Sequence, residues 1–447
     1  MFIVEPQRQI PVIAQADLCV VGGSCTGVFA AIRAARLGLR VVLIEKHNIL
    51  GGTAVTGLVN IWHSLHDTDN RQQVIAGLTA ETIERLERRN AVEKSADAAT
   101  AYRFNPFELA LVLDEYIKEN KIHVMLHTSY AAPVYEGRRV EAVIVENIEG
   151  RFAVKADFFI DASGDGRVAR DLGLPAYTNE TIQPPTSCFY LQGNTKGLPL
   201  GNLIREHGHE FGLEDDWGWS CHLTGSRDIS MRADNHVFGL RLDCAEDMTK
   251  AEMEGRRRAD AFASLLRKYS GRDETYPIVG MCSHIGTRET VHYKTRFKAD
   301  VNALLLGDRY GAPVLNGTYR VDIHHSEDMG ITFRYLDGRE DTFYGKNTRK
   351  VTSNWRECMG LTGTPAKYYQ LPFDILVVEE YDNFIPVGRM INADDGAFGA
   401  LRVMVNLNQL GEAAGVAAYL SLHTQVTVPS LSPRQVTELL RTGGSAF

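Results

Sequence analysis

The strongest constraint on this fold is the segment 17–46, DLCVVGGSCTGVFAAIRAARLGLRVVLIEK, which joins two short apolar runs through a glycine turn and a helical pattern. Residues 18–21 form an apolar run that predicts a strand buried on both faces, as in parallel sheets. Over about residues 26–37, apolar side chains recur at helical spacing, and Gly38 supplies a C-terminal cap. A second apolar run, Val41–Ile44, follows. The segment predicts one β-α-β unit of about 30 residues.

The turn between the first strand and the helix has the spacing of a dinucleotide-binding turn. Gly22 permits a tight exit from the strand, and Gly27 lets the helix pack closely against it. The free N–H groups of a helix N-terminus favour phosphate, and Glu45, 23 residues after Gly22, can accept hydrogen bonds from a ribose diol. Ser24 stands where the middle glycine of the motif is expected, but it is small and its hydroxyl can bond a phosphate. A structural turn without a ligand is the alternative.

Length, charge and cysteine spacing narrow the class of protein. With 447 residues the chain exceeds a single typical core, so two domains are expected. The net charge of −8 gives no indication of a nucleic-acid or anionic-membrane partner. No run of about 18 apolar residues is present, and the first residues lack the pattern of a signal peptide. The seven cysteines form no CxxC pair, which predicts reduced thiols and a cytoplasmic location.

The distribution of apolar and polar residues predicts an α/β fold with an interrupted first domain. Alternation between about residues 175 and 350 suggests an antiparallel sheet, broken by a charged helix over about 250–269. Buried apolar segments return after residue 368 and end in a long helix over about 400–422. We expect a three-layer, Rossmann-like domain with a central parallel sheet, carrying an inserted α+β substrate domain that contains the antiparallel sheet. The expected limits are residues 1–175 and 360–447 for the first domain and 176–359 for the insertion.

A second glycine pair, Gly51-Gly52, follows soon after Glu45 in the stretch KHNILGGTAVTGLVN. In a nicotinamide-binding domain, another crossover helix would normally begin at this point. An extended FAD, whose tail runs on towards its flavin ring, explains why the backbone must approach the ligand a second time. The pair therefore favours FAD over NAD as the dinucleotide.

Separated segments in the rest of the chain agree with this assignment. They are GGTAVTG after the acidic residue, FFIDASGDGRVARDLGLP at 158–175, SHIGTRETVHY at 283–293, VDIHH at 321–325, YYQLPFDILV at 368–377 and a C-terminal segment at 383–420. Together they resemble the FAD-dependent oxidoreductases of the glutathione reductase-like superfamily, in the group related to fumarate reductase flavoproteins. The resemblance extends over nearly the whole chain and implies non-covalent FAD as the cofactor. With the glycine turn, it implies FAD contacts from Gly22, Gly23, Ser24, Cys25, Thr26, Gly27, Glu45, Lys46, Gly51, Gly52, Thr53, Ala162, Ser163, Gly164, Asp165, Gly388, Arg389, Gly399, Ala400, Leu401 and Arg402.

The C-terminal segment is expected to hold the flavin. GAFGALRV, residues 396–403, places small residues ahead of a helix whose N-terminus would face the ring. Arg402 and the helix dipole would stabilise the negative charge of the reduced ring; a surface arginine is the alternative. The turn Val387-Gly388-Arg389 departs from the family pattern, in which an acid follows the glycine. Either Arg389 pairs with phosphate or Asp394 supplies the acid.

The expected reaction is hydride transfer between a small organic substrate and flavin N5, because the cofactor carries the redox chemistry. Arg288 is a candidate for binding a carboxylate or an oxyanion, with Glu289 orienting it. A buried Arg–Glu pair that joins the two domains is an equal alternative. His284, beside this pair, and His63, after the second glycine pair, are candidates for proton transfer. For both, a structural histidine is the alternative.

The sequence is also compatible with other substrate contacts and other classes of function. Trp217 and Trp219, in the stretch WGWSC, are expected either to wall an organic substrate or to lie in the core. The histidine pairs in HSLH and HGHE have no evident third ligand, so no metal site is expected. A flavin-dependent group-transfer or RNA-modifying enzyme, and an electron-transfer subunit of a larger complex, are the other function classes. The acidic balance disfavours the former, and the lack of an iron–sulfur cysteine cluster disfavours the latter. The electron acceptor is undefined, and a homo-oligomer is compatible with the sequence.

Overall fold

A seven-stranded sheet, whose parallel part comes from both ends of the chain, forms the centre of the fold. The computed structural model describes residues 2–214, 219–233, 235–325, 329–344 and 349–447. Within them the sheet has the order β6-β2-β1-β9-β8-β7, and β22 pairs with the C-terminal end of β9. Its strands are β1 (Val12–Val21), β2 (Val41–Ile44), β6 (His123–Met125), β7 (Ser129–Glu136), β8 (Arg139–Asn147), β9 (Gly150–Asp161) and β22 (Phe384–Pro386). β1, β2, β6, β9 and β22 pair in parallel, whereas β8 is antiparallel to both β9 and β7.

The predicted β-α-β unit is confirmed. β1 and β2 pair in parallel, with Leu18 opposite Val41, and helix α1 (Cys25–Arg36) connects them. Gly38 follows the helix with a φ of +103°, a conformation in which a side chain would be strained. β1 begins earlier than expected because residues 12–15 pair with β9 through their backbones while remaining largely exposed. Gln15 and Asp17 interrupt the apolar residues before Leu18, so the apolar run marks only the buried half of the strand.

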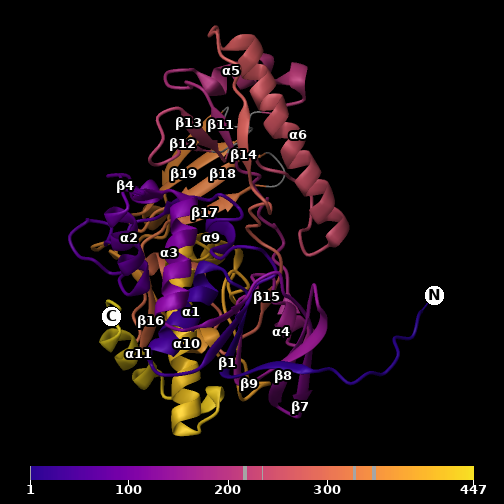
Figure 1. Ribbon diagram of the computed structural model, residues 1–447. Helices are drawn as coiled ribbons and strands as arrows, with labels where there is room; N and C mark the ends of the chain where they lie inside the picture. Colours follow the sequence, from indigo (N-terminus) through magenta and orange to yellow (C-terminus); the bar gives the residue numbers. More distant parts are fainter. Residues whose placement is uncertain (1, 215–218, 234, 326–328, 345–348) are drawn as a thin grey trace.

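Helix α10 (Met404–Thr424) packs directly on α1 over the central sheet (Figure 1). A Cβ atom at Gly411 would lie 2.2 Å from the carbonyl oxygen of Thr26, and one at Gly415 would lie 2.3 Å from that of Ala30. Only glycine allows the two backbones to approach this closely. The N-terminal half of α1 is therefore held against the middle of α10.

The long helix expected over about 400–422 is confirmed as α10, but it begins later than expected because a separate short helix precedes it. Helix α9 (Asp395–Leu401) ends before Arg402, Val403 is extended with a φ of −70° and a ψ of 144°, and α10 begins at Met404. Helix α9 packs against strand β17 (Val321–His324), where a Cβ atom at Gly399 would lie 2.7 Å from the carbonyl oxygen of Asp322. This packing fixes the direction of α9 independently of α10.

The middle of the chain forms antiparallel sheets, as expected. In Figure 1, one sheet and two helices form the upper lobe, with buried clusters of their own around Phe189 and Cys188. These elements are β11 (Phe189–Gln192), β12 (Ser220–His222), β13 (Ile229–Arg232), β14 (Ile278–Met281), α5 (Leu200–His207) and α6 (Ala245–Tyr269). A second antiparallel sheet consists of β17, β18 (Ile331–Arg334), β19 (Arg339–Tyr344) and β20 (Arg349–Asn354). From Ala299 onward, residues such as Leu315 and Trp355 join the main core rather than the core of the upper lobe.

Shorter elements complete the structure. The helices are α2 (Leu78–Arg88), α3 (Pro106–Glu119), α4 (Arg167–Asp171), α7 (Val301–Leu306), α8 (Trp355–Cys358) and α11 (Pro433–Thr442). The strands are β3 (Ile61–Trp62), β4 (Val92–Lys94), β5 (Tyr102–Phe104), β10 (Ala176–Tyr177), β15 (His292–Tyr293), β16 (Pro313–Gly317) and β21 (Tyr369–Pro372). Single 3-10 turns lie at η1 (Gly52–Ala54), η2 (Ala98–Thr100), η3 (Gly208–Phe211), η4 (Phe373–Leu376) and η5 (Val428–Ser430). In the part of the chain that the structure describes, every helix is too short or too polar to cross a bilayer.

Candidate active site

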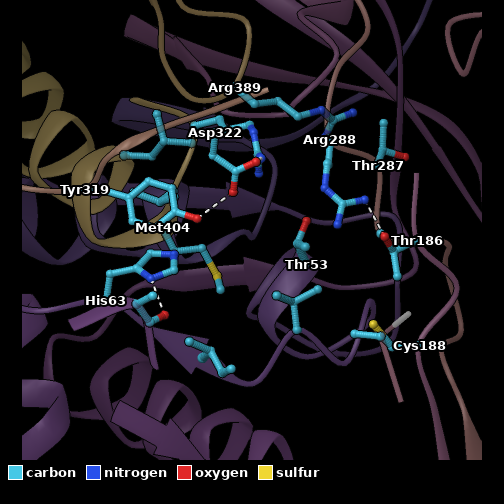
Figure 2. A pocket seen from close by; sticks show the side chains of 18 of the residues that line it. Thr53, His63, Thr186, Cys188, Thr287, Arg288, Tyr319, Asp322, Arg389 and Met404 are labelled. Atoms are coloured by element: carbon cyan, nitrogen blue, oxygen red, sulfur yellow. Dashed lines mark hydrogen bonds and ion pairs between the residues drawn. The ribbon is translucent and has the colours of Figure 1, made fainter. Parts of the chain in front are cut away.

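A cavity of about 390 Å³ lies where the carboxyl ends of the parallel strands meet the antiparallel sheet of β17–β20. Residues that directly follow β1, β9 and β22 form one wall, and residues of β17 and β18 form another. Figure 2 shows Tyr319 and His63 on one side of the cavity and Arg288 and Thr186 on the other, with Thr53 between them in this view. The carboxyl ends of parallel strands are where open α/β sheets bind their ligands.

The predicted FAD contacts divide into two sets. Those that line the cavity are Ser24, Cys25, Thr26, Gly51, Thr53, Ala162, Gly164, Gly388, Arg389 and Arg402. Those outside its lining are Gly22, Gly23, Gly27, Glu45, Lys46, Gly52, Ser163, Asp165, Gly399, Ala400 and Leu401. Trp219 also lines the cavity, whereas Trp217 lies outside the described residues.

The glycine turn after β1 has the close approaches that the motif requires. Gly22 has a φ of +108°, and a Cβ atom there would lie 2.4 Å from the carbonyl oxygen of Ala162. A Cβ atom at Gly27 would lie 2.0 Å from the carbonyl oxygen of Gly22. Ser24 has a φ of −63°, which any residue adopts, and its Oγ caps α1 by accepting from the N–H of Gly27 at 3.3 Å. The departure from the motif at Ser24 therefore costs the turn nothing and adds a cap.

The start of α1 is suited to an anion. The N–H of Cys25 faces the carbonyl oxygen of Gly51 in an isolated β-bridge, whereas the N–H of Thr26 has no hydrogen-bond partner among the described residues; both residues line the cavity. The helix N-terminus adds a partial positive charge. Burial raises the pKa of the Cys25 thiol to about 12, so this cysteine is a neutral thiol rather than a nucleophilic thiolate. These properties match the phosphates of a dinucleotide.

Glu45 is buried and anchors the turn through its carboxylate. It accepts from the N–H of Gly23 at 2.6 Å and from the N–H of His47 at 2.8 Å. Each oxygen keeps a further lone pair, so the predicted ribose contact stays a prediction. Lys46 is exposed.

At the turn after β22, two alternatives were expected: Arg389 pairs with phosphate, or Asp394 supplies an acid. The structure places these two residues differently. Arg389 pairs with Asp165 and lies over Gly164, where a Cβ atom would be 2.5 Å from the Arg389 guanidinium. Asp394 instead caps α9, accepting from the N–H of Ala397 at 2.7 Å and from the N–H of Val301 at 2.9 Å. Asp394 does not line the cavity and cannot supply the acid there, whereas Arg389 lines it.

The N-terminus of α10 faces the same cavity. Val403, Met404 and Leu407 line it, no side chain caps the helix, and the N–H groups of Met404 and Val405 lack partners among the described residues. Arg402 pairs with Asp322 at 3.2 Å. Because α10 begins at Met404, the small residues 399–401 belong to α9 and serve its packing on β17.

The predicted pairing of Arg288 with Glu289 is wrong. Glu289 is buried and accepts from Asn179 at 2.8 Å and from the N–H of Gln183 at 2.9 Å, and it lies 3.0 Å from His292. Adjacent residues of an extended segment point to opposite sides, which separates the two side chains. Glu289 therefore organises the segment behind the cavity, and it does not orient Arg288.

Arg288 lies in the cavity wall and is held by neutral groups. Its Nη1 donates to the carbonyl oxygen of Pro184 at 2.7 Å and to the hydroxyl of Thr186, and its Nη2 lies 3.1 Å from His236 Nε2. Burial, together with the nearby Arg402, lowers the pKa of Arg288 to about 10, so its guanidinium still carries a charge at neutral pH. Its Nε–H has no partner among the described residues.

The two predicted histidines lie in different surroundings. His284 bonds the carbonyl oxygen of Ile285 at 2.9 Å, stacks edge-on with His47, and does not line the cavity. His63 does line it, stacks on Tyr319 with ring centroids 4.0 Å apart, and has Nδ1 2.6 Å from the carbonyl oxygen of Ala99. Burial lowers the pKa of His63 to about 3. His63 is therefore neutral in this structure, with a proton on Nδ1, and its Nε2 can accept a proton rather than donate one.

Sequence reasoning missed a cluster of charged residues around Asp322. Arg288, Arg320 and Arg402 surround this carboxylate, and we call the three the arginine cluster. Burial would raise the pKa of Asp322, but Arg402, Arg320 and Arg288 outweigh it and hold the pKa below its ordinary value. Tyr319 donates to Asp322 at 2.6 Å, and His324 lies 3.5 Å from it. Asp322 and His324 alternate along VDIHH, so a strand with polar groups on a buried face was the available signal.

Comparisons with known proteins agree with this geometry. A family model described as FAD dependent oxidoreductase matches residues 17–440. The chain is 30% identical to the mitochondrial dihydrolipoyl dehydrogenase of Schizosaccharomyces pombe over 216 residues, 43% of this chain and 38% of that one. It is also 30% identical to a dihydrolipoyl dehydrogenase of Trypanosoma brucei brucei over 271 residues, 56% of this chain and 52% of that one. The matches thus span about half or less of these curated relatives.

Solved structures resemble the chain more distantly. A geranylgeranyl bacteriochlorophyll reductase-like protein from Thermoplasma acidophilum aligns with a TM-score of 0.48 and 11% identity, covering 96% of this chain and 83% of that one. A flavin-dependent brominase aligns with a TM-score of 0.44 and 12% identity, covering 96% and 83%. Likenesses at this level carry no argument about function. The family match covers nearly the whole chain and coincides with the glycine turn, the cavity and the two helix N-termini that line it, so the chain belongs to the FAD-dependent oxidoreductase family, and FAD is its cofactor.

Proposed function

We propose that this enzyme exchanges a hydride between a small organic substrate and FAD held non-covalently in the cavity. The observation that carries the proposal is one continuous cavity shared by the N-terminus of α1, the uncapped N-terminus of α10 and the arginine cluster. FAD, when bound, supplies a two-electron acceptor and donor at its N5 atom. The substrate then belongs in the space beside β17 and β18.

The chain's own residues fit FAD. The N–H of Thr26 and the Arg389 guanidinium would hold the pyrophosphate, and Glu45 would accept from the ribose. The N-terminus of α10, reinforced by Arg402, would stabilise negative charge on the ring. The raised pKa of Cys25 keeps its thiol protonated and favours a cofactor held without a covalent link to this cysteine.

His63 is the residue we propose for the substrate's proton. Its Nδ1–H is fixed on the carbonyl oxygen of Ala99, and stacking on Tyr319 restricts the ring, so Nε2 is presented as an acceptor. In the oxidative direction, the hydride leaves the substrate carbon while Nε2 accepts the proton of the neighbouring heteroatom. Arg288, which is held by three neutral partners, would orient the polar end of the substrate.

The first test is the visible absorption spectrum of the purified protein, before and after acid precipitation. We expect a yellow protein whose flavin appears in the supernatant, and anaerobic bleaching by an organic substrate. Deuteration of the reacting C–H bond should slow the bleaching, because hydride transfer breaks that bond. Gly22→Val is the matched negative variant, since a side chain there meets Ala162 and requires an unfavourable φ. A colourless protein that takes up no added FAD would refute the proposal.

A further inference from the structure

The arginine cluster is not neutralised by the residues around it. Asp322 is the carboxylate that faces Arg288, Arg320 and Arg402, and it forms an ion pair with Arg402 alone. Asp97 also lines the cavity, but it is exposed and caps η2 by accepting from the N–H of Ala99 at 3.0 Å. Within the described residues, three cations therefore face one buried carboxylate. Buried charge without a partner is costly, and a ligand can supply the partner.

Arg320 is the arginine of the cluster with the fewest polar contacts to described residues. Its guanidinium forms no hydrogen bond and no ion pair with any described residue, and its Nε is buried without a partner. It lies 4.0 Å from the centre of the Phe333 ring, with Tyr319 and Tyr335 at 5.4 and 5.5 Å. These rings fix the guanidinium plane by cation–π contact but accept none of its hydrogen bonds. Its N–H groups are available to the cavity that it lines.

Apolar and aromatic side chains line the cavity together with Arg320. Phe333 of β18 lies against its guanidinium, Ile331 of the same strand lines the cavity, and Trp219 contributes from the upper lobe. A planar guanidinium with free N–H groups matches the two oxygens of a carboxylate. An apolar wall beside that fork matches a hydrocarbon body. The site thus combines an anion anchor with room for an organic group.

We propose that the substrate is an organic carboxylate whose carboxylate is bound by Arg320, with Arg288 as the second cation. This inference rests on the proposed function, and it names the substrate class. The negative charge of the ligand would pair with Arg320. Arg402 would remain paired with Asp322 and lie beside the ring of the cofactor. A neutral substrate would offer Arg320 no opposite charge and would leave its buried Nε–H without a charged acceptor.

The test is ligand binding to the FAD-loaded protein, measured as a flavin difference spectrum and, independently, by titration calorimetry. Acetate, butyrate and benzoate are each compared with the corresponding amide at constant ionic strength, with inorganic phosphate as a further probe. We expect at least one carboxylate to bind about tenfold or more tightly than its amide, because a charged hydrogen-bond pair is lost in the amide. Phosphate should bind more weakly than that carboxylate, since it lacks a hydrocarbon body for the apolar wall.

Variants of Arg320 locate the effect. Arg320→Met keeps an apolar stem against Phe333 and should weaken carboxylate binding about tenfold or more while leaving the FAD content unchanged. Arg320→Lys retains the positive charge but not the planar guanidinium. Its affinity for the carboxylate should therefore lie between those of the unaltered protein and Arg320→Met. Arg339→Met is the matched control, because Arg339 stacks on the other side of the cluster at 3.8 Å from Tyr335, is exposed, and does not line the cavity.

Three outcomes would overturn the assignment. One is equal binding of every carboxylate and its amide, another is stronger binding of phosphate than of any carboxylate, and the third is equal loss in Arg320→Met and Arg339→Met. None of these touches the proposed function, whose failure shows instead as missing flavin or as flavin that no organic substrate bleaches. If Arg320→Met does not fold, the Lys variant and the carboxylate–amide comparison on the unaltered protein still decide the question.

Discussion

The contact between α1 and α10 should control FAD affinity, and Gly411→Ala is the perturbation that tests this. A Cβ atom at Gly411 would lie 2.2 Å from the carbonyl oxygen of Thr26, where real Cβ contacts stay above 3.0 Å. The Thr26 backbone must therefore move by about 0.8 Å or more. Thr26 lines the cavity at the start of α1, where we place the phosphates. The displacement reaches the N–H group that would bind them.

Two magnitudes follow from this geometry. Overpacking costs about 1–3 kcal/mol, and the higher helix propensity of alanine offsets about 1 kcal/mol, so we expect a net loss of about 0–2 kcal/mol in the free energy of unfolding. Weakening one hydrogen bond to a charged phosphate costs about 1.5 kcal/mol or more, which corresponds to an FAD dissociation constant about tenfold higher.

Gly415→Ala is the matched control, because its Cβ atom would lie 2.3 Å from the carbonyl oxygen of Ala30, one helical turn farther along α1. It should lose a similar amount of stability while changing the FAD dissociation constant by less than about twofold. The constants are measured by ultrafiltration, and stability by urea unfolding at a fixed concentration of free FAD, because bound ligand itself adds stability. A native FAD affinity in Gly411→Ala, or an equal loss of affinity in both variants, would refute the placement of FAD at the start of α1.

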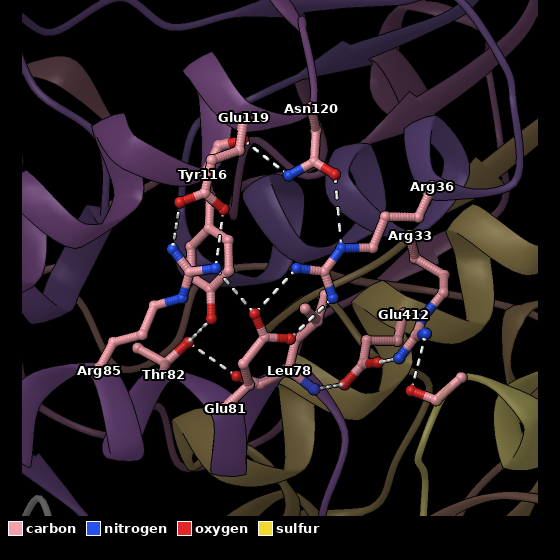
Figure 3. A network of polar contacts seen from close by, with 11 residues as sticks. Arg33, Arg36, Leu78, Glu81, Thr82, Arg85, Tyr116, Glu119, Asn120 and Glu412 are labelled. Atoms are coloured by element: carbon pink, nitrogen blue, oxygen red, sulfur yellow. Dashed lines mark hydrogen bonds and ion pairs between the residues drawn. The ribbon is translucent and has the colours of Figure 1, made fainter.

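Three further predictions concern buried groups. Arg33 and Glu412 form a buried ion pair between α1 and α10, and Glu412 also accepts from the N–H of Leu78 at 2.9 Å, at the start of α2 (Figure 3). In urea unfolding, Arg33→Met should lower the free energy of unfolding by about 3–5 kcal/mol, because it leaves the Glu412 carboxylate buried without its partner. The double variant Arg33→Met/Glu412→Leu should recover part of that loss. If the losses of the two single variants simply add in the double variant, the two residues are not coupled. Burial lowers the pKa of His63 to about 3 in the folded protein, whereas in the unfolded chain it stays near 6.5. As pH falls below about 6.5, the unfolded chain therefore binds a proton at His63 that the folded protein does not, and the free energy of unfolding decreases. As pH falls from 6.5 to 5, the free energy of unfolding of His63→Gln should thus rise relative to that of the unaltered protein, by at most about 1.4 kcal/mol per pH unit. A difference in stability between the two proteins that does not change with pH would exclude a neutral His63. Arg402→Met should lower the flavin reduction potential, measured by anaerobic dye equilibration, because a cation beside the reduced ring is removed; an unchanged potential would exclude that role.

Much of the fold could be predicted because its signals are local. The β-α-β unit at 17–46 is encoded by apolar periodicity and glycine spacing within one short segment, and its register follows from them. The partly wrong predictions concern contacts between segments. Glu289 was assigned to its neighbour Arg288, but folding brings Asn179 and His292 to it instead. Sequence adjacency gives no information about a partner contributed by another segment.

The sequence by itself determined the dinucleotide turn and the FAD family, because hydrogen bonding and close packing restrict which residues can occupy a strand–turn–helix. Only the tertiary structure decided which charges share the cavity. Arg288, Arg320 and Arg402 come from three distant segments, and they meet around Asp322 because α9 packs on β17 and breaks before α10. Coulomb interactions depend on separation in space and on burial, neither of which is encoded by spacing along the chain. The net positive charge of the substrate space is therefore a property of the folded protein.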